Sequence, residues 1–358
     1  MNDSTLFGVA GTDADRFRQY QSRVFFSKAD GAYPPEIREP HIAQFRDHLT
    51  AIVSAVLHIT VVDIEELPRR TLHYVYRVRT NEKSYVVRIN ACGAFYREFQ
   101  FTIERWVTET LRFRGIPTVA VHAADITRSL VPFDFEILDD AGTSIYDRSK
   151  NSVIDEVLVT KFGTFVASLH TIRTEGYGPL NIRDIAQGRA RGIHDSWQQF
   201  FLLNADRHLE ACNMAGILDE ASVTDAKRVL AHAENLPFSD PILLHGDLAH
   251  HNVFTDGKVI TSLIDWEDCI SGDPVFDVAY YATGCFGNGQ WYDAFLQGYR
   301  SVRPLPSDFS RRFALYYLRI AVVKALVRER FGSAASVHLP HIVNRLRFAI
   351  TQAKKQFA

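Results

Sequence analysis

Three side chains in the middle of the chain could together carry out phosphoryl transfer. The segment HGDLAHHN contains Asp247 and Asn252, and Asp265 follows in the short run IDW. A side-chain amide oxygen and a carboxylate are hard ligands that suit a Mg²⁺ ion bridging nucleotide phosphates. Asp247 would then remain able to orient an attacking hydroxyl and accept its proton. The pattern predicts one general base and two metal ligands.

The residues between Asn252 and Asp265 must fold so that these two side chains meet. Apolar runs on either side of Asp256-Gly257 are typical of two strands joined by a tight turn. Such a hairpin returns Asp265 to the loop that carries Asn252. A lone Asp more often caps a turn or a helix, but the ordered set HGDxxxxN, hairpin, IDW and GDPVFD favours a functional site.

These segments resemble the aminoglycoside phosphotransferase family. HGDLAHHN resembles the catalytic loop of that family, and IDWEDCISGDPVFDVA resembles its metal-binding aspartate and the segment that follows. The resemblance implies that Asp247 is the catalytic base, that Asn252 and Asp265 bind Mg²⁺, and that ATP or GTP is the co-substrate. The loop departs from the family at Ala249, where many members have a second histidine.

The resemblance also implies an α+β, bilobal, protein-kinase-like fold, with a small antiparallel β-sheet N-lobe and a larger, mainly helical C-lobe. We accordingly expect an extension over residues 1–40, a nucleotide-binding N-lobe over 41–138 and a C-lobe with the catalytic loop and acceptor-binding helices over 139–358. Asp273 and Asp277 are expected to be structural and to tie the catalytic loop in place.

Hydrophobic periodicity predicts the elements that surround these motifs. Helices are expected from His41 to Leu57 and from Phe99 to Leu111, and strands at Ile59–Leu67, Tyr74–Arg79, Ser84–Asn90 and Phe133–Leu138. Beyond residue 142 the sequence has a helical pattern to about residue 235 and again from about 290 to 356, with a β-rich island around the catalytic motifs.

A phosphoryl-transfer site also needs a cation for the α- and β-phosphates, held by an acid on a neighbouring helix. Arg88 is the candidate cation, because alternation places it opposite its apolar neighbours in SYVVRI. Glu104 is the candidate anchor, with Glu98 and Glu109 as substitutes and an unrelated surface ion pair as the alternative. The segments YVVRINACGA and FYREFQFTIERWVTETLRFRGIP resemble the hygromycin B phosphotransferase branch of the family.

The other nucleotide contacts are less clear in the sequence. The segment LPRRTLH, residues 67–73, stands where a loop should cover the phosphates, yet it contains no glycine to let the backbone approach them. Thr71 and its neighbouring amides are the candidates there. Ile137 and Leu138 lie in a segment that resembles the interlobe hinge, whose backbone would hold the base, although a simple strand end fits as well.

The acceptor is predicted from charge alone. Glu267, Asp268 and Asp273 crowd the catalytic segment with few cations, which favours a cationic small molecule such as an aminoglycoside or aminocyclitol antibiotic. The alternatives are a kinase for a metabolite such as an amino alcohol or sugar, and a nucleotide-binding pseudoenzyme. Asp195 and Trp197 are weak candidates for the acceptor pocket.

Composition excludes several other classes of protein. The 358 residues carry a net charge of −2 and a pI near 6.7, which argues against a nucleic-acid partner. The start resembles no signal peptide and no apolar run would cross a bilayer, so we expect a cytoplasmic monomer or weak dimer. The four cysteines are widely spaced and indicate neither a disulfide framework nor a zinc site. Adjacent His250 and His251 could not easily face one zinc ion.

Overall fold

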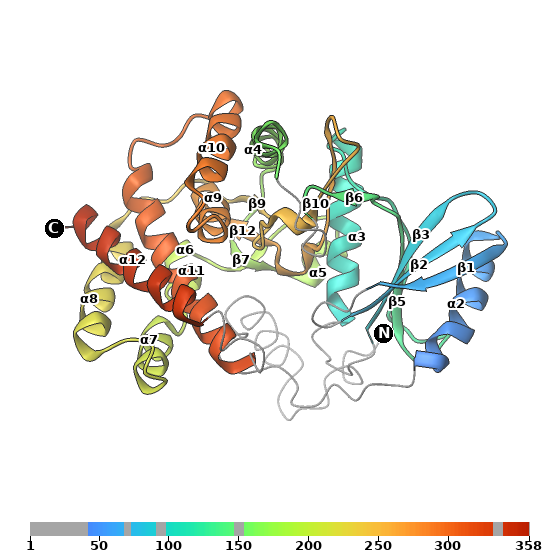
Figure 1. Cartoon of the computed structure of the whole chain (residues 1–358), viewed down its shortest axis with the longest axis horizontal. Coiled ribbons are helices and arrows are strands. Elements are labelled where there is room, and N and C mark those ends of the chain that lie inside the picture. The colour runs from blue at the N-terminus through green and yellow to red at the C-terminus, as the bar shows by residue number, and fades with distance from the viewer. Residues whose placement is uncertain (1–41, 68–72, 91–97, 147–153, 332–338, 358) are drawn as a thin grey trace. The chain divides into compact units, whose positions relative to one another are not determined.

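The structure is a computed structural model that describes residues 42–67, 73–90, 98–146, 154–331 and 339–357. These residues form two compact units, coloured along the chain in Figure 1. Unit 1 takes its described residues from 42–146 and 251–267, and unit 2 from 154–250 and 268–357. The chain thus returns to unit 1 for one short segment before it completes unit 2. The extension expected over residues 1–40 lies outside the described residues.

Unit 1 is built on an antiparallel sheet whose strands pair in the order β1-β2-β3-β5-β4. The strands are β1 (Val61–Glu66), β2 (Tyr74–Thr80), β3 (Ser84–Asn90), β4 (Val121–Asp125) and β5 (Asp134–Asp139). The sequence predicted four of these strands and missed β4. In that strand only Val121 is a strong strand former, and the pattern VHAAD does not alternate clearly between apolar and polar residues.

A helix covers each face of this sheet (Figure 1). Helix α2 (Ile42–Leu57) packs Phe45, Leu49 and Val53 against the aromatic and branched side chains of β2 and β3. Helix α3 (Glu98–Phe113) lies on the other face, where Arg88 of β3 meets Glu104. The alternation of β3 therefore separates an apolar face from the face that carries Arg88, as predicted.

Unit 1 also contains a small sheet made by the segment that returns from the middle of the chain. Its strands pair in the order β11-β10-β6, with bounds β6 (Thr143–Ser144), β10 (Val253–Thr255) and β11 (Ile260–Leu263). Strands β10 and β11 are antiparallel, which confirms the predicted hairpin. Pairing of β10 with β6 joins this hairpin to the N-terminal part of the chain.

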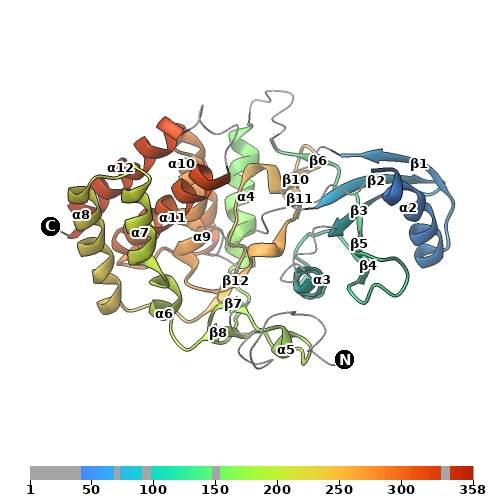
Figure 2. The same cartoon turned by 90° about the horizontal axis from the view of Figure 1, so that it is seen from below.

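Unit 2 is mainly helical. Its helices are α4 (Glu156–Leu169), α5 (Ile182–Ile185), α6 (Trp197–Phe201), α7 (Ala205–Met214), α8 (Glu220–Ala231), α9 (Pro274–Gly284), α10 (Gly289–Val302), α11 (Phe309–Phe331) and α12 (Leu339–Phe357). Helix α11 contributes a nearly continuous set of buried side chains to the core, and α7, α8 and α12 gather around it (Figure 2). The apolar stretch of α11 is thus a packed core helix.

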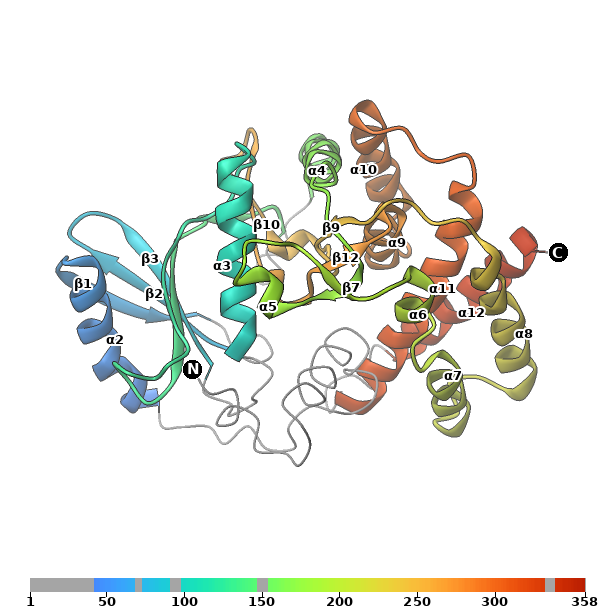
Figure 3. The ribbon, with the colours of Figure 1, turned by 180° about the vertical axis from the view of Figure 1, so that it is seen from behind.

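A four-stranded sheet of short strands lies within unit 2 (Figure 3). Its order is β8-β7-β12-β9, with bounds β7 (Tyr177–Leu180), β8 (Gly192–His194), β9 (Ile242–Leu244) and β12 (Ile270–Gly272). The expectation of continuous helix from 142 to 235 is wrong at β7 and β8. These strands are three or four residues long and rich in glycine, so they carry too few side chains to show a period of two.

Two further expectations concern the chain as a whole. No helix among residues 42–357, as far as they are described, is both long and apolar enough to cross a membrane. Cys212, Cys269 and Cys285 are buried and none of them forms a disulfide within the described part of the chain, and Cys92 lies outside the described residues. The described residues form a mixed α+β structure with an antiparallel sheet first and a mainly helical part after it, which confirms the predicted class.

Candidate active site

The loop that carries Asp247 follows β9 and is held by a buried carboxylate of unit 2. The backbone N–H groups of His245 and Gly246 donate to Asp277 at 2.7 and 2.9 Å. The N–H of Asp247 donates to Nδ1 of His245 at 3.2 Å, which ties the backbone of Asp247 to that side chain. Asp277 is fully buried at the start of α9, so the predicted structural role of this residue is confirmed.

Gly246 brings this loop close to another part of unit 2. Its backbone is left-handed, with φ of +78°, and a Cβ atom there would lie 2.0 Å from the carbonyl oxygen of Asp268. Any side chain would therefore clash with backbone, and glycine is the residue that avoids both the clash and the φ penalty. Close packing therefore requires glycine at position 246, next to the proposed base Asp247.

Asp277 is itself supported from behind by two buried groups. Nε2 of His170 lies 3.2 Å from Asp277, and Nδ1 of the same ring lies 2.8 Å from the hydroxyl of Tyr299. Burial lowers the pKa of His170 below its usual value, although Asp277 acts in the opposite direction. The neutral imidazole therefore links α10 to the carboxylate that holds the catalytic loop. Sequence reasoning missed His170, because a single histidine at a helix end gives no pattern.

Asp273 has a comparable structural role. Its carboxylate caps α9 by accepting the N–H of Val275 at 2.9 Å, and it pairs with Arg312 of α11 at 2.5 Å. Both charged groups are buried, so the pair satisfies two ions that could not stay unpaired in the core. The expected structural role of Asp273 is therefore confirmed, and its charge is neutralised by Arg312.

The last part of the loop is fixed by aromatic contacts within unit 2. Nε2 of His250 bonds the hydroxyl of Tyr281, and the His250 ring packs edge-on against Tyr281 and Trp291 with centroids 5.1 and 5.2 Å apart. Asp277 and Tyr281 lie one helical turn apart on α9. One face of α9 therefore holds both the beginning and the end of the segment from His245 to His250.

The β10–β11 hairpin brings the two proposed metal ligands together in unit 1. Val253 pairs with Leu263, and the N–H of Ile264 donates to the carbonyl of Asn252 at 3.0 Å. Asn252 immediately precedes β10 and Asp265 lies two residues after the end of β11, so both residues lie beyond the same end of this strand pair. Their amide and carboxylate oxygens form the hard donor set that Mg²⁺ requires. Asp265 has a left-handed φ of 71°, which an aspartate adopts more readily than most residues.

Arg88 lies in a group of buried carboxylates on the α3 face of the sheet. It forms ion pairs with Glu104 of α3, with Glu136 of β5 at 2.9 Å and with Asp265 at 3.4 Å. Burial lowers the pKa of Arg88, but these three carboxylates and that of Glu267 together outweigh burial and raise it overall. The predicted pair of Arg88 and Glu104 is thus present. Among the predicted substitutes, Glu109 pairs with Arg105 on the exposed side of α3.

Sequence reasoning missed Glu136, which lies directly opposite Arg88 in the pairing of β3 with β5. Its side chain is fully buried, and burial, followed by the charge of Glu104, raises its pKa well above the usual value. The available signal was an acid at an inward position of an otherwise apolar strand. Buried acids of this kind are rarely retained without a partner, so Glu136 implied a cation nearby.

The remaining predicted nucleotide contacts are placed as follows. Ile137 and Leu138 are buried in β5, and their residues pair with β3 on one side and β4 on the other. Thr71 lies outside the described residues. The neighbouring His73 is described, and its Nε2 lies 3.3 Å from Glu267. The nucleotide-binding roles of Thr71, Ile137 and Leu138 remain proposals.

The predicted acceptor residues lie in different surroundings. Glu267 has a half-buried side chain beside His73 in unit 1, and Asp268 in unit 2 is 4 % exposed. The N–H of Asp195 donates to Gln199 at 3.3 Å. Trp197 is 1 % exposed and packs among Phe200, Phe201, Phe276 and Tyr316. Its burial gives no support to a direct contact with an acceptor.

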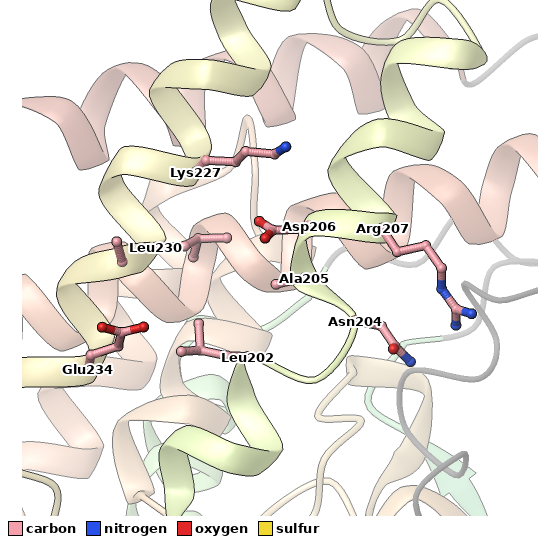
Figure 4. A pocket seen from close by; sticks show the side chains of 9 residues that line it. Leu202, Asn204, Ala205, Asp206, Arg207, Lys227, Leu230 and Glu234 are labelled. Carbon is pink, nitrogen blue, oxygen red and sulfur yellow. The ribbon is translucent and has the colours of Figure 1, made fainter.

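Unit 2 also contains a cavity of about 500 Å³ against α7 and α8, shown in Figure 4. Its lining mixes apolar and charged side chains, among them Leu202, Asn204, Arg207, Lys227 and Glu234. Lys227 is paired with Glu210 at 2.5 Å. The residues that line this cavity include none of the predicted site residues, so it is separate from the catalytic loop.

Comparison with known proteins adds to this geometry. Hygromycin-B 4-O-kinase of Escherichia coli is 26% identical over 289 residues, which cover 77% of this chain and 78% of the relative. A protein named as a probable ketoamine kinase of Vibrio vulnificus is 26% identical over 271 residues, covering 72% of this chain and 84% of the relative.

Solved structures show the same fold at lower identity. A thermostable mutant of aminoglycoside phosphotransferase APH(4)-Ia, in complex with AMP-PNP and hygromycin B, aligns with a TM-score of 0.65 at 19% identity. The alignment covers 85% of this chain and 98% of that one, which confirms the predicted kinase-like fold. The model of the phosphotransferase enzyme family matches residues 63–312, a span that includes the Arg88 cluster, the catalytic loop and the hairpin. The chain belongs to the phosphotransferase enzyme family.

Proposed function

We propose that this chain transfers the γ-phosphoryl group of Mg²⁺-bound ATP or GTP to a hydroxyl group of a small molecule. The observation that carries this proposal is the β10–β11 hairpin, which returns Asp265 to the end of the strand pair at which Asn252 lies, with the Ile264 N–H bonded to the Asn252 carbonyl. Two hard oxygen ligands at one end of a hairpin, next in sequence to the loop that carries Asp247, support phosphoryl transfer.

Each residue has a separate proposed role. Asp247 orients the acceptor hydroxyl and takes its proton, in a loop that Asp277 keeps in one conformation. Asn252 and Asp265 hold Mg²⁺, which when bound neutralises the charge that develops on the phosphate oxygens. Arg88, held by Glu104 and Glu136, is the proposed cation for the nucleotide phosphates. Positioning and charge compensation supply most of the catalysis in this class of reaction.

The acceptor has two candidates of the same chemical type. Similarity to Hygromycin-B 4-O-kinase supports an aminoglycoside or aminocyclitol, and similarity to a ketoamine kinase supports a sugar-like metabolite. The acidic residues that favoured a polycation give less support than expected. Asp273 is paired with Arg312, and Asp268 is almost fully buried, so neither presents a free negative charge to solvent.

The test of the reaction is the replacement Asp247→Asn. Loss of the general base should lower turnover by roughly 100- to 10,000-fold, while binding of the Mg-nucleotide persists because Asn252, Asp265 and Arg88 are unchanged. Turnover is measured by mass shift of an acceptor panel that includes aminoglycosides and sugars, and nucleotide binding by calorimetry.

Asp240→Asn is the matched control, because the Asp240 side chain is 86% exposed and pairs only with the exposed Arg173 among the described residues. Wild-type turnover in Asp247→Asn would reject the base assignment. Tight nucleotide binding by the wild type with transfer to no acceptor would instead support a nucleotide-binding pseudoenzyme.

A further inference from the structure

Two cations of unit 2 meet at the C-terminal end of α9. Lys324 of α11 donates through Nζ to the Thr283 hydroxyl at 2.7 Å, and Arg345 of α12 donates to the Thr283 carbonyl at 3.0 Å. The ammonium group of Lys324 also lies 3.5 Å from the centroid of the Tyr280 ring. Three helices therefore bring two positive charges to one residue.

These two cations lack an acidic partner within the described part of the chain. Neither Lys324 nor Arg345 has a carboxylate oxygen within 4.0 Å among residues that the structure describes. Arg345 is 8% exposed, and its Nε atom has no hydrogen-bond partner among these residues. Lys324 is half-buried. Cations removed from water are normally paired, so an anion in contact with both groups would complete their pairing.

Lys324 and Arg345 contact the same helix, α9, that holds the catalytic loop. Helix α9 carries Asp277 and Tyr281, which hold that loop, and Tyr280 and Thr283, which contact Lys324. Burial, together with the charge of Arg345, lowers the pKa of Lys324 to about 7, while the carboxylate of Asp247 acts to raise it. The Lys324 ammonium is therefore within electrostatic reach of the proposed base.

A simpler explanation is that the cations cap the C-terminus of α9, where positive charge is favourable. This explanation suits Arg345, which bonds the Thr283 carbonyl. It does not suit Lys324, because Lys324 bonds a side-chain hydroxyl and leaves the helix carbonyls alone. A second cation beside a capping arginine adds repulsion, which an anion in contact with both would remove.

We propose that Lys324 and Arg345 receive an acidic group of the acceptor, a carboxylate or a phosphate, while Asp247 takes the proton of its hydroxyl. This inference rests on the function proposed above. In the transfer, a bond forms between the acceptor oxygen and the γ-phosphorus, the bond to the β–γ bridging oxygen breaks, and the hydroxyl proton passes to Asp247. The nucleoside diphosphate leaves. The acidic group takes no part in bond making and only orients the acceptor.

The proposal makes the acceptor a sugar-like molecule with a negative charge. A polycationic aminoglycoside would bring its ammonium groups toward Lys324 and Arg345, and like charges at this distance weaken binding. Binding of an acidic acceptor should also weaken as pH rises above about 7, because Lys324 then loses its proton. Burial also lowers the pKa of Arg345, while Tyr317 and Tyr280 act to raise it. Asp247, Cys285 and Arg328 are the other ionisable groups that act on Lys324.

The experiment compares three acceptors of one shape: glucose, glucuronate and glucosamine, with glucose 6-phosphate as a second acid. The wild-type protein should phosphorylate or bind the acids with the lowest KM or Kd. Lys324→Gln should raise the KM for the acids about tenfold or more, since a hydrogen bond to a charged group is lost. The KM for glucose and for the Mg-nucleotide should not change, and Lys324→Arg should keep the preference for acids.

Lys355→Gln is the matched control, because Lys355 is an exposed lysine on α12. An increase in the KM for the nucleotide in Lys324→Gln would overturn the proposal in favour of a contact with nucleotide phosphate. A lower melting temperature of Lys324→Gln with unchanged KM values would show that Lys324 only stabilises the fold and does not contact the acceptor. Calorimetry of acid binding distinguishes failure of the proposed kinase activity from failure of the proposed acid site. Acid binding without phosphoryl transfer would count against the kinase activity. Transfer to glucose or glucosamine without preference for the acids would count against the acid site.

Discussion

At the scale of single residues, the Arg88 cluster shows how a buried charge is used. One guanidinium faces the carboxyl groups of Glu104, Glu136 and Asp265, so full ionisation would give an excess of negative charge, and burial with the charge of Glu104 accordingly raises the pKa of Glu136. Such an excess is costly in a core. Additional cations would neutralise the excess negative charge, and the proposed Mg²⁺ at Asp265 is one such cation.

Removing Arg88 should therefore destabilise the protein more than removing an exposed arginine. Arg88→Met leaves Glu104 and Glu136 buried without a cation, and we expect a loss of about 3 to 5 kcal/mol. The double variant Arg88→Met with Glu136→Gln should recover part of that loss, because one of the stranded acids becomes neutral. Urea unfolding followed by tryptophan fluorescence measures both effects, and Trp266 is buried in the same unit.

Arg79→Met on the neighbouring strand β2 is the control. Arg79 also pairs with two carboxylates, Asp63 at 2.5 Å and Glu65 at 2.8 Å, but its side chain is 50% exposed. Exposed pairs contribute about 1 kcal/mol or less. Equal effects of Arg88→Met and Arg79→Met would show that burial of the cluster is energetically unimportant.

The sequence predicted individual residues well where they belong to an ordered motif. The pair of Arg88 and Glu104 followed from strand alternation and from the spacing of the next helix. Glu136 and Lys324 did not follow, for opposite reasons. Glu136 lies in an otherwise apolar strand. Lys324 lies on a helix about 40 residues after Thr283 and Tyr280, which its ammonium group contacts. Contacts between elements far apart in sequence decide both cases.

At the scale of elements, the catalytic loop depends on how closely it packs. Gly246 and Gly257 both have left-handed φ values, +78° and +90°, so a side chain strains the backbone at either position. Only at Gly246 would a Cβ meet another atom, the Asp268 carbonyl at 2.0 Å. At Gly257 nothing lies within 4 Å.

We therefore expect Gly246→Ala and Gly257→Ala to differ sharply. Gly257→Ala should cost about 1 kcal/mol from left-handed strain and leave turnover unchanged. Gly246→Ala adds the clash, and should displace the loop and lower kcat by at least tenfold, since small misplacements at a reacting centre have large effects. Melting temperature and single-turnover rates measure the two effects, and similar rates in the two variants would show that close packing at Gly246 is dispensable.

The elements themselves were predictable in proportion to their length. Helices α2 and α3 and the strands β2, β3 and β5 have clear periods, and the Asp-Gly turn identified the β10–β11 hairpin. Strands β7 and β8 were missed. Their glycines permit close approach but contribute no side-chain pattern. Strand β8 pairs with β7, and β7 pairs with β12, in which Ile270 lies opposite Pro179 from a distant part of the sequence.

At the scale of the whole molecule, unit 1 and unit 2 each have their own hydrophobic core. The core of unit 1 joins α2 to the five-stranded sheet, and the core of unit 2 is built around α11. Separate cores permit separate unfolding transitions. The chain nevertheless passes from unit 2 into unit 1 and back at residues 251–267, so neither unit consists of one continuous segment.

Calorimetry should detect this organisation. We expect heat unfolding to show a calorimetric enthalpy larger than the van't Hoff enthalpy, as for a protein with more than one cooperative unit. A Mg-nucleotide at about 100 times its Kd should stabilise the protein by about 2.7 kcal/mol, and the shift should vanish in Asp265→Asn, which lacks the proposed metal carboxylate. A single two-state transition, or a shift that survives Asp265→Asn, would contradict the expectation.

The left-handed backbone of Asp265 also affects how this protein can change by mutation. Aspartate, asparagine and glycine are among the residues that tolerate a φ of 71° at least cost. Each of the two replacements differs from an aspartate codon by one base. A single nucleotide substitution can therefore remove the proposed metal ligand and leave the local fold intact.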